Sequence, residues 1–140
     1  MITYIDTSSL LKLLIDEDGS DRAGRLWDTA DAVASVALVV VEARAALAAA
    51  ERSDRLTATE HRRAKTELDV LVEELTIIEV TEDLIAQAAG LAENEALRGY
   101  DAVHLAAALT VGADVLTSAD SALCAAAERC GVHVANPLDA

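Results

Sequence analysis

Aromatic residues are the scarcest class in this chain of 140 residues, which has no phenylalanine, one tryptophan and two tyrosines. Many proteins that recognise single-stranded RNA by its sequence stack splayed bases on surface aromatic rings. Tyr4, Trp27 and Tyr100 are too few to build such a platform. The composition therefore argues against the stacking modules as the basis of function.

Long uncharged runs are also missing. The two longest stretches without Asp, Glu, Lys or Arg are residues 32–41 and 102–113, and both are far shorter than the roughly 20 residues that a membrane-spanning helix needs. The first residues, MITYID, contain no basic segment followed by an apolar stretch, so no secretory signal is expected. We therefore expect a cytoplasmic protein without a membrane span.

Cysteine and proline are rare as well. Cys124 and Cys130 are six residues apart, which fits neither a CxxC metal motif nor a helical i,i+4 pair. No proline precedes Pro137, and no Gly/Ser linker or internal repeat interrupts the chain. Because apolar residues make up 53% of the sequence and charged residues 26%, we expect one folded domain over residues 1–140.

Basic residues are outnumbered, since 11 Lys and Arg stand against 25 Asp and Glu and the formal net charge is −14. A charge of this sign opposes the approach of a polyanion unless metal ions or a local basic patch intervene. Any function on nucleic acid must therefore answer this electrostatic objection.

Short apolar segments alternate with amphipathic ones along the whole chain. Strands are predicted at residues 2–5, 32–36, 76–80, 114–117 and 132–134. Helices are predicted at about residues 10–15, 22–30, 42–52, 58–75, 82–92, 101–111 and 119–130. This alternation predicts a three-layer α/β domain, with a central parallel sheet of four to five short strands flanked by about seven helices.

Four acids are expected at one edge of this sheet. Asp6 directly follows the first predicted strand, Asp120 lies just after the fourth, and Glu42 and Asp101 begin predicted helices. Ligands of parallel sheets bind beyond the carboxyl ends of the strands, where these acids would lie. Taken singly, the last three also fit helix capping, because the N-terminus of a helix favours negative charge. Asp6 equally fits an Asx turn.

Four carboxylates in one crevice are unfavourable by themselves, because they repel one another and some would stay protonated. Hard divalent cations such as Mg²⁺ and Mn²⁺ take oxygen ligands and bridge carboxylates to phosphates. A bound metal would remove the repulsion, so the acids predict a divalent-cation site.

Four local sequences carry a resemblance to a known family: YIDTSSLLKL at residues 4–13, VEARAAL at 41–47, GYDAVHLAAA at 99–108 and LTSAD at 116–120. In order and separation these motifs resemble those of the PIN-domain ribonucleases. More narrowly, the chain resembles the VapC-type toxins of bacterial type II toxin–antitoxin pairs. The resemblance covers essentially the whole chain.

The resemblance implies functional residues. Position by position, it makes Asp6, Glu42, Asp101 and Asp120 the metal-binding and catalytic acids. It also implies that Ser118 is the small hydroxyl residue before the last acid and that Thr7 supports Asp6. The implied cofactor is Mg²⁺ or Mn²⁺. The implied activity is endonucleolytic cleavage of RNA by a homodimer that a VapB-type antitoxin neutralises.

Hydrolysis at such a site would use a metal-activated water, because a bound cation lowers the pKa of a coordinated water and neutralises charge at the phosphate. No nucleophilic side chain is then required. The main alternative is a catalytically inert PIN-like interaction module, against which the complete set of acids argues. An aspartyl-phosphate phosphatase is a weak alternative, because Ser8 stands where those enzymes have a second acid.

Four further polar residues lie near the acid-bearing segments. His104 is one turn after Asp101, but the surrounding VHLAAAL is typical of a packed helix and favours a structural role. Lys12, Arg44 and Arg98 are candidates for contacts to RNA phosphates. Solvated helix faces and weak surface ion pairs are the alternative for these three bases.

Overall fold

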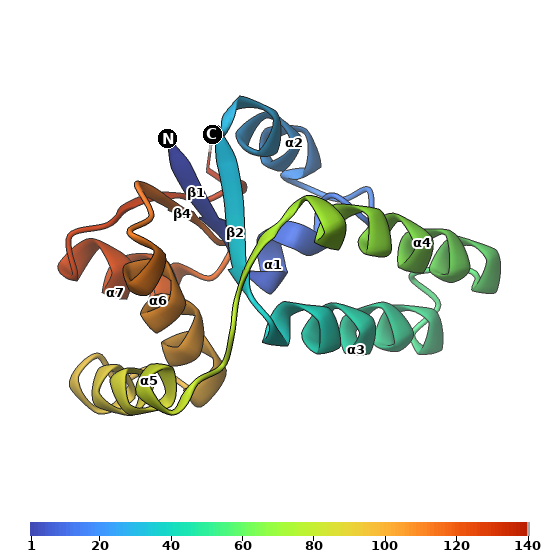
Figure 1. Ribbon diagram of the computed structural model, residues 1–140. Coiled ribbons are helices and arrows are strands. Elements are labelled where there is room, and N and C mark those ends of the chain that lie inside the picture. Colours follow the sequence, from blue (N-terminus) through green and yellow to red (C-terminus); the bar gives the residue numbers. More distant parts are fainter. Residues whose placement is uncertain (140) are drawn as a thin grey trace.

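A computed structural model describes residues 1–139 of the chain (Figure 1). Its strands are β1 (Ile2–Ile5), β2 (Ala32–Val36), β3 (Thr76–Ile78), β4 (Val115–Thr117) and β5 (His133–Ala135). Its helices are α1 (Thr7–Leu11), α2 (Ser20–Thr29), α3 (Leu38–Arg52), α4 (Ala58–Glu74), α5 (Glu82–Asn94), α6 (Gly99–Val111) and α7 (Ser121–Arg129). These elements confirm the predicted α/β class, with five strands and seven helices in the described residues.

All five strands are parallel, and their order across the sheet is β3-β2-β1-β4-β5. The central strand is therefore β1, with β2 and β3 on one side of it and β4 and β5 on the other. The boundary between β1 and β4 is the point where these two halves diverge, and ligand crevices form at such points. Asp6, the residue after β1, lies at this boundary.

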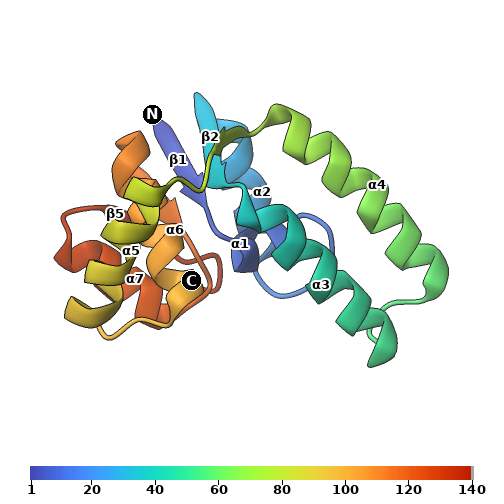
Figure 2. The same ribbon diagram turned by 60° about the horizontal axis from the view of Figure 1, so that its bottom comes forward.

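Two hydrophobic cores cover the two faces of the sheet. Side chains alternate between the faces along a strand, so Tyr4 and Ile5 point in opposite directions. Tyr4 belongs to the core made with α5, α6 and α7. Ile5 belongs to the core made with α1, α3 and α4. The same division into layers is visible in Figure 2, where α5, α6 and α7 lie across the strands from α3 and α4.

Two predicted helices differ most from the observed ones. Helix α3 starts at Leu38 instead of residue 42, because Val39, Ala43 and Leu47 are all fully buried at four-residue spacing and favour a continuous helix. Glu42 consequently lies in the second turn of α3 and cannot be its cap. Helix α1 ends at Leu11, and the apolar residues up to 15 follow in turns.

Helices α4 and α5 begin where the sequence predicts, whereas α6 begins at Gly99, two residues before the predicted start at Asp101. A capping box starts α4, in which the Thr57 hydroxyl accepts the Glu60 amide and the Glu60 carboxylate accepts the Thr57 amide. Although α4 has 17 residues, neither it nor any other helix within residues 1–139 is long and apolar enough to cross a membrane.

Candidate functional site

Asp6 lies at the carboxyl end of β1 and caps α1, where its Oδ1 accepts the amide N–H of Ser9 at 3.0 Å. The Ser8 hydroxyl donates to the same oxygen at 2.7 Å, and the Ser118 hydroxyl donates to Oδ2 at 2.6 Å. The residue is 4% exposed, and no base within residues 1–139 forms a salt bridge with it. Burial raises the pKa of Asp6 and outweighs the attraction of His104 and these hydrogen bonds.

Glu42 points from the second turn of α3 toward the start of α1 and the middle of α6. Its Oε1 accepts the Thr7 hydroxyl at 2.8 Å and lies 2.8 Å from Nε2 of His104. Burial alone would raise the pKa of Glu42, but the hydrogen bond and attraction from His104, together with the Thr7 hydrogen bond, lower it below its ordinary value. Glu42 is therefore held as a carboxylate.

Asp101 and Asp120 are bridged by one arginine. Asp101 lies in the first turn of α6, and Asp120 caps α7 by accepting the amides of Ala122 and Leu123 at its Oδ1. The Arg98 guanidinium lies 3.3 Å from Oδ2 of Asp101 and 3.5 Å from Oδ2 of Asp120. Its side chain is 84% exposed, so this contact is a surface ion pair at the mouth of the site and is easily exchanged.

The four predicted acids are connected by shared contacts or a shared groove at the carboxyl edge of the sheet. The Ser118 hydroxyl, which donates to Asp6, also accepts the amide N–H of Asp120 at 3.0 Å. Glu42 and Asp101 line an open groove of about 760 Å³, whose other walls are mainly apolar side chains of α3, α5 and α6. In this arrangement, no three Asp, Glu, His or Cys side chains of the described chain are grouped to hold one metal ion.

The supporting and basic residues differ from expectation in two cases. Thr7 donates to Glu42 and not to Asp6, for which Ser8 takes the expected role. Lys12 is 7% exposed, and its ammonium contacts Oε1 of Glu17 at 3.1 Å and a backbone carbonyl at 2.7 Å. This burial argues against the phosphate contact predicted for Lys12.

Arg44 and Arg98 keep accessible guanidinium groups. Arg44 pairs with Asp69 of α4 at 3.3 Å, and its side chain is about half exposed. Arg98 is the predicted base that directly contacts the acids.

Sequence reasoning missed the role of two residues. In the sequence, Ser8 stands out only as a departure from the phosphatase pattern, yet its hydroxyl donates to Asp6 and so helps to hold that carboxylate. His104 was interpreted as structural, and it is indeed 3% exposed, but its ring also contacts Glu42. The i,i+3 spacing from Asp101 indicates that His104 lies on the side of α6 that faces the site. Its partner Glu42 could not be found in this way, because it is 62 residues away in sequence.

Comparisons with known proteins agree with this geometry. The family model described as the PIN domain matches residues 3–129. Ribonucleases VapC45 and VapC49, from two strains of Mycobacterium tuberculosis, are each 42% identical over 136 residues, which is 96% of this chain and 94% of theirs.

Solved structures share the fold at lower identity. FitAcB from Neisseria gonorrhoeae aligns with a TM-score of 0.73 at 20% identity, over all of both chains. A toxin–antitoxin complex from Klebsiella pneumoniae aligns with a TM-score of 0.70 at 17% identity, over 99% of each chain. With the parallel sheet, its acid-lined edge and the extent of the sequence match, the chain belongs to the PIN-domain family and, within it, to the VapC group.

Proposed function

We propose that this chain is a metal-dependent endoribonuclease that acts as the toxin of a toxin–antitoxin pair. The observation that carries the proposal is the environment of Asp6, a buried carboxylate with three hydrogen-bond donors and no salt bridge to any base within residues 1–139, at an edge shared with three further acids. The names of the two Mycobacterium tuberculosis relatives, which are ribonucleases, support the assignment of RNA as substrate.

The oxygen chemistry of the side chains fits a hard divalent cation, although the acids would have to move closer together to hold one ion. All four acids offer oxygen ligands, which Mg²⁺ and Mn²⁺ prefer. Within residues 1–139 no hydrogen bond reaches Oε2 of Glu42, and Oδ2 of both Asp101 and Asp120 contacts the exposed Arg98. A cation would also offset the cost of burying Asp6 as a charged group. We assign Mg²⁺ as the cofactor, with Mn²⁺ as a substitute, held by these four acids.

The four acids and two arginines can each be assigned a role in cleavage. When bound, the ion would acidify a coordinated water and neutralise charge at the scissile phosphate. We assign Asp6 and Asp101 to the principal ion, and Glu42 and Asp120 to a second ion or to the orientation of water. The Oε2 atom of Glu42 has the free lone pairs that orienting a water requires. Arg98 must leave the carboxylates and is then free to contact an RNA phosphate, as is Arg44.

The negative charge of the chain and its exposed apolar side chains indicate two protein partners. The net charge of −14 and the acid-lined crevice suit a basic segment of a VapB-type antitoxin, and the Klebsiella pneumoniae neighbour is itself a toxin–antitoxin complex. We further propose a homodimer, supported by the exposed apolar side chains of Val41, Val80 and Ile85. A toxin acting on cellular RNA would work in the cytoplasm.

The test is cleavage of total RNA by the purified chain in Mg²⁺ or Mn²⁺, with a chelator in parallel. Cleavage is expected only with the metal, and Asp6→Asn should abolish it. Asp28→Asn is the matched control. Asp28 is exposed on α2, and its replacement removes the same charge outside the segments that carry the four acids.

Two results would overturn the proposal. Cleavage that persists in chelator would rule out the metal. Absence of cleavage in either metal, with intact binding of an antitoxin, would instead support the inert interaction module, for which the Arg98 bridge across Asp101 and Asp120 is the favouring observation.

A further inference from the structure

A buried hydrogen-bonded chain connects the sheet backbone to Glu42. His104 of α6 lies between Tyr4 and Glu42. Its Nδ1 is 2.7 Å from the Tyr4 hydroxyl, and its Nε2 is 2.8 Å from Oε1 of Glu42. Tyr4 is fully buried and His104 is 3% exposed. The Tyr4 and His104 rings meet edge to face, with centroids 5.8 Å apart.

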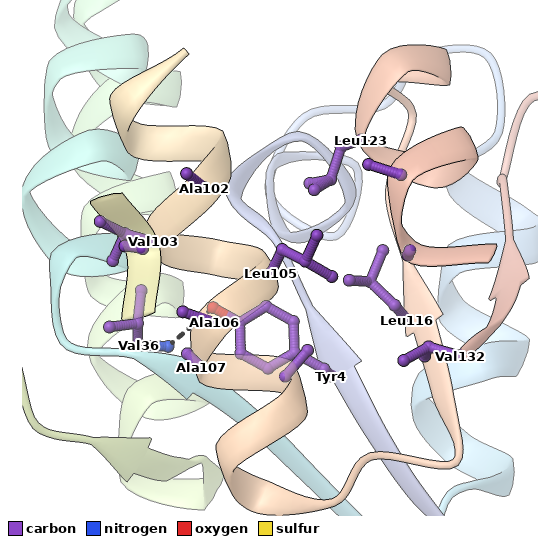
Figure 3. Close-up of a cluster of buried hydrophobic side chains, with 14 of the residues drawn as sticks. Tyr4, Val36, Ala102, Val103, Leu105, Ala106, Ala107, Leu116, Leu123 and Val132 are labelled. Carbon is purple, nitrogen blue, oxygen red and sulfur yellow. Dashed lines mark hydrogen bonds between the residues drawn. The ribbon is translucent and has the colours of Figure 1, made fainter. Parts of the chain in front are cut away.

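The donors and acceptors along this chain can be ordered so that every contact has one donor and one acceptor. The backbone N–H of Val36 donates to the Tyr4 hydroxyl at 3.2 Å, a contact drawn as a dashed line in Figure 3. The neighbouring Ser35 hydroxyl donates to the carbonyl of Ile5. In the neutral imidazole, the Tyr4 hydroxyl then donates to Nδ1 of His104, and the proton on Nε2 is donated to Glu42.

We propose that Tyr4 and His104 are positioning residues, which fix the Glu42 carboxylate so that its Oε2 faces the groove. Without these contacts, a glutamate with three rotatable bonds and a partly exposed side chain would sample several rotamers. The His104 and Thr7 donors both bind Oε1, and this leaves Oε2 directed to a ligand. The proposal rests on the proposed metal-dependent cleavage, in which Glu42 serves the ion or the water.

Partners that orient a metal-binding side chain typically change metal affinity or activity by about 10- to 100-fold when they are removed. His104→Leu should therefore weaken Mn²⁺ binding, followed by electron paramagnetic resonance of free Mn²⁺, by about 10-fold. The same variant should lower kcat for RNA cleavage with little change in KM. His104→Gln keeps an N–H donor toward Glu42 and should restore part of both.

The matched control is His61→Leu. His61 makes a similar contact, with Nδ1 2.9 Å from Oε1 of Glu51, but on the α3–α4 pair and away from the acids. It should leave Mn²⁺ affinity and kcat unchanged. Thermal unfolding of each variant separates loss of positioning from loss of the fold.

A second measurement works on the metal-free protein and needs no activity. Nitrogen-15 spectra of the histidine rings should show His104 protonated at Nε2 and unprotonated at Nδ1, and Tyr4→Phe should remove this preference while the fold persists. A ring without a proton on Nε2 in the wild type would overturn the inference. So would wild-type Mn²⁺ affinity and kcat in folded His104→Leu. Failure of the proposed function is distinguished from both, because the wild type would then not cleave RNA at all.

Discussion

The Ser118 hydroxyl donates to Oδ2 of Asp6 at 2.6 Å, across 112 residues of sequence. The Oγ atom of Ser118 also accepts the backbone N–H of Asp120 at 3.0 Å. One fully buried hydroxyl therefore ties the acid after β1 to the acid after β4. Since both strands end at this edge, the distance between the two carboxylates depends on Ser118.

Replacement of Ser118 by alanine should loosen this connection. Ser118→Ala leaves the Asp120 amide without its acceptor and Asp6 without one donor, and an unmet buried group costs about 1–3 kcal/mol. We expect the free energy of unfolding to fall by about that amount and Mn²⁺ affinity to fall with it. Urea unfolding and Mn²⁺ titration measure the two effects. Ser53→Ala, which removes the hydroxyl of an exposed residue bonded to a helix carbonyl, should change neither by much.

Asp6→Asn should change how stability depends on pH in metal-free protein. The pKa of Asp6 is raised above its ordinary 3.8 in the folded state, so its contribution to stability is complete below that pH and is lost as the pH rises through the raised value. Asparagine has no such loss. The variant should therefore gain stability relative to the wild type as pH increases from 4 to neutrality, as measured by urea unfolding in chelator. A difference that stays constant with pH would contradict the assigned shift.

Much of the fold and the place of Asp6 at the end of a strand could be predicted, because both depend on local pattern. Asp6 follows a short apolar strand and needs only that strand to be located. The start of α3 could not be predicted, since Val39, Val40 and Val41 suit a strand equally well and only burial of Val39 against Ala43 and Leu47 favours the helix.

Long-range contacts account for the other differences. The Lys12 stem is buried because Glu17 and the carbonyl of residue 18 happen to receive its ammonium. The contact of His104 with Glu42 joins two helices that sequence periodicity describes only one at a time. Such pairings arise from the tertiary arrangement, which no local pattern contains.

Arg98→Ala should increase the affinity for metal. The guanidinium contacts Oδ2 of both Asp101 and Asp120, so it competes with a cation for the same oxygens. Its removal should tighten Mn²⁺ binding severalfold and change the stability of metal-free protein by less than about 1 kcal/mol, because the side chain is exposed. Arg129→Ala, which breaks the comparable Arg129–Glu95 pair on the surface, is the control. Unchanged Mn²⁺ affinity in Arg98→Ala would show that Arg98 does not occupy the site in solution.

Association with a VapB-type antitoxin should be accelerated at low ionic strength. A chain of net charge −14 attracts a basic segment over long range, and salt screens this attraction. The association rate, measured by stopped-flow fluorescence of the single Trp27, should fall as NaCl increases. Equal rates from low to high salt would remove electrostatic steering from the account and leave apolar contacts as the source of binding.

RNA should be admitted by divalent ions and a few local bases, since the chain has no excess of positive charge with which to hold it. Each Lys or Arg contact to a phosphate releases counterions, so few contacts predict a shallow dependence of RNA affinity on monovalent salt. With Ca²⁺ as a non-catalytic substitute, RNA should bind more tightly than in chelator, and Arg98→Ala should weaken binding in Ca²⁺ without displacing the ion. Arg62→Ala, an exposed base on α4, is the control and should have no effect. Equally tight binding in chelator, together with a steep salt dependence, would mean that a basic surface elsewhere on the molecule holds the RNA.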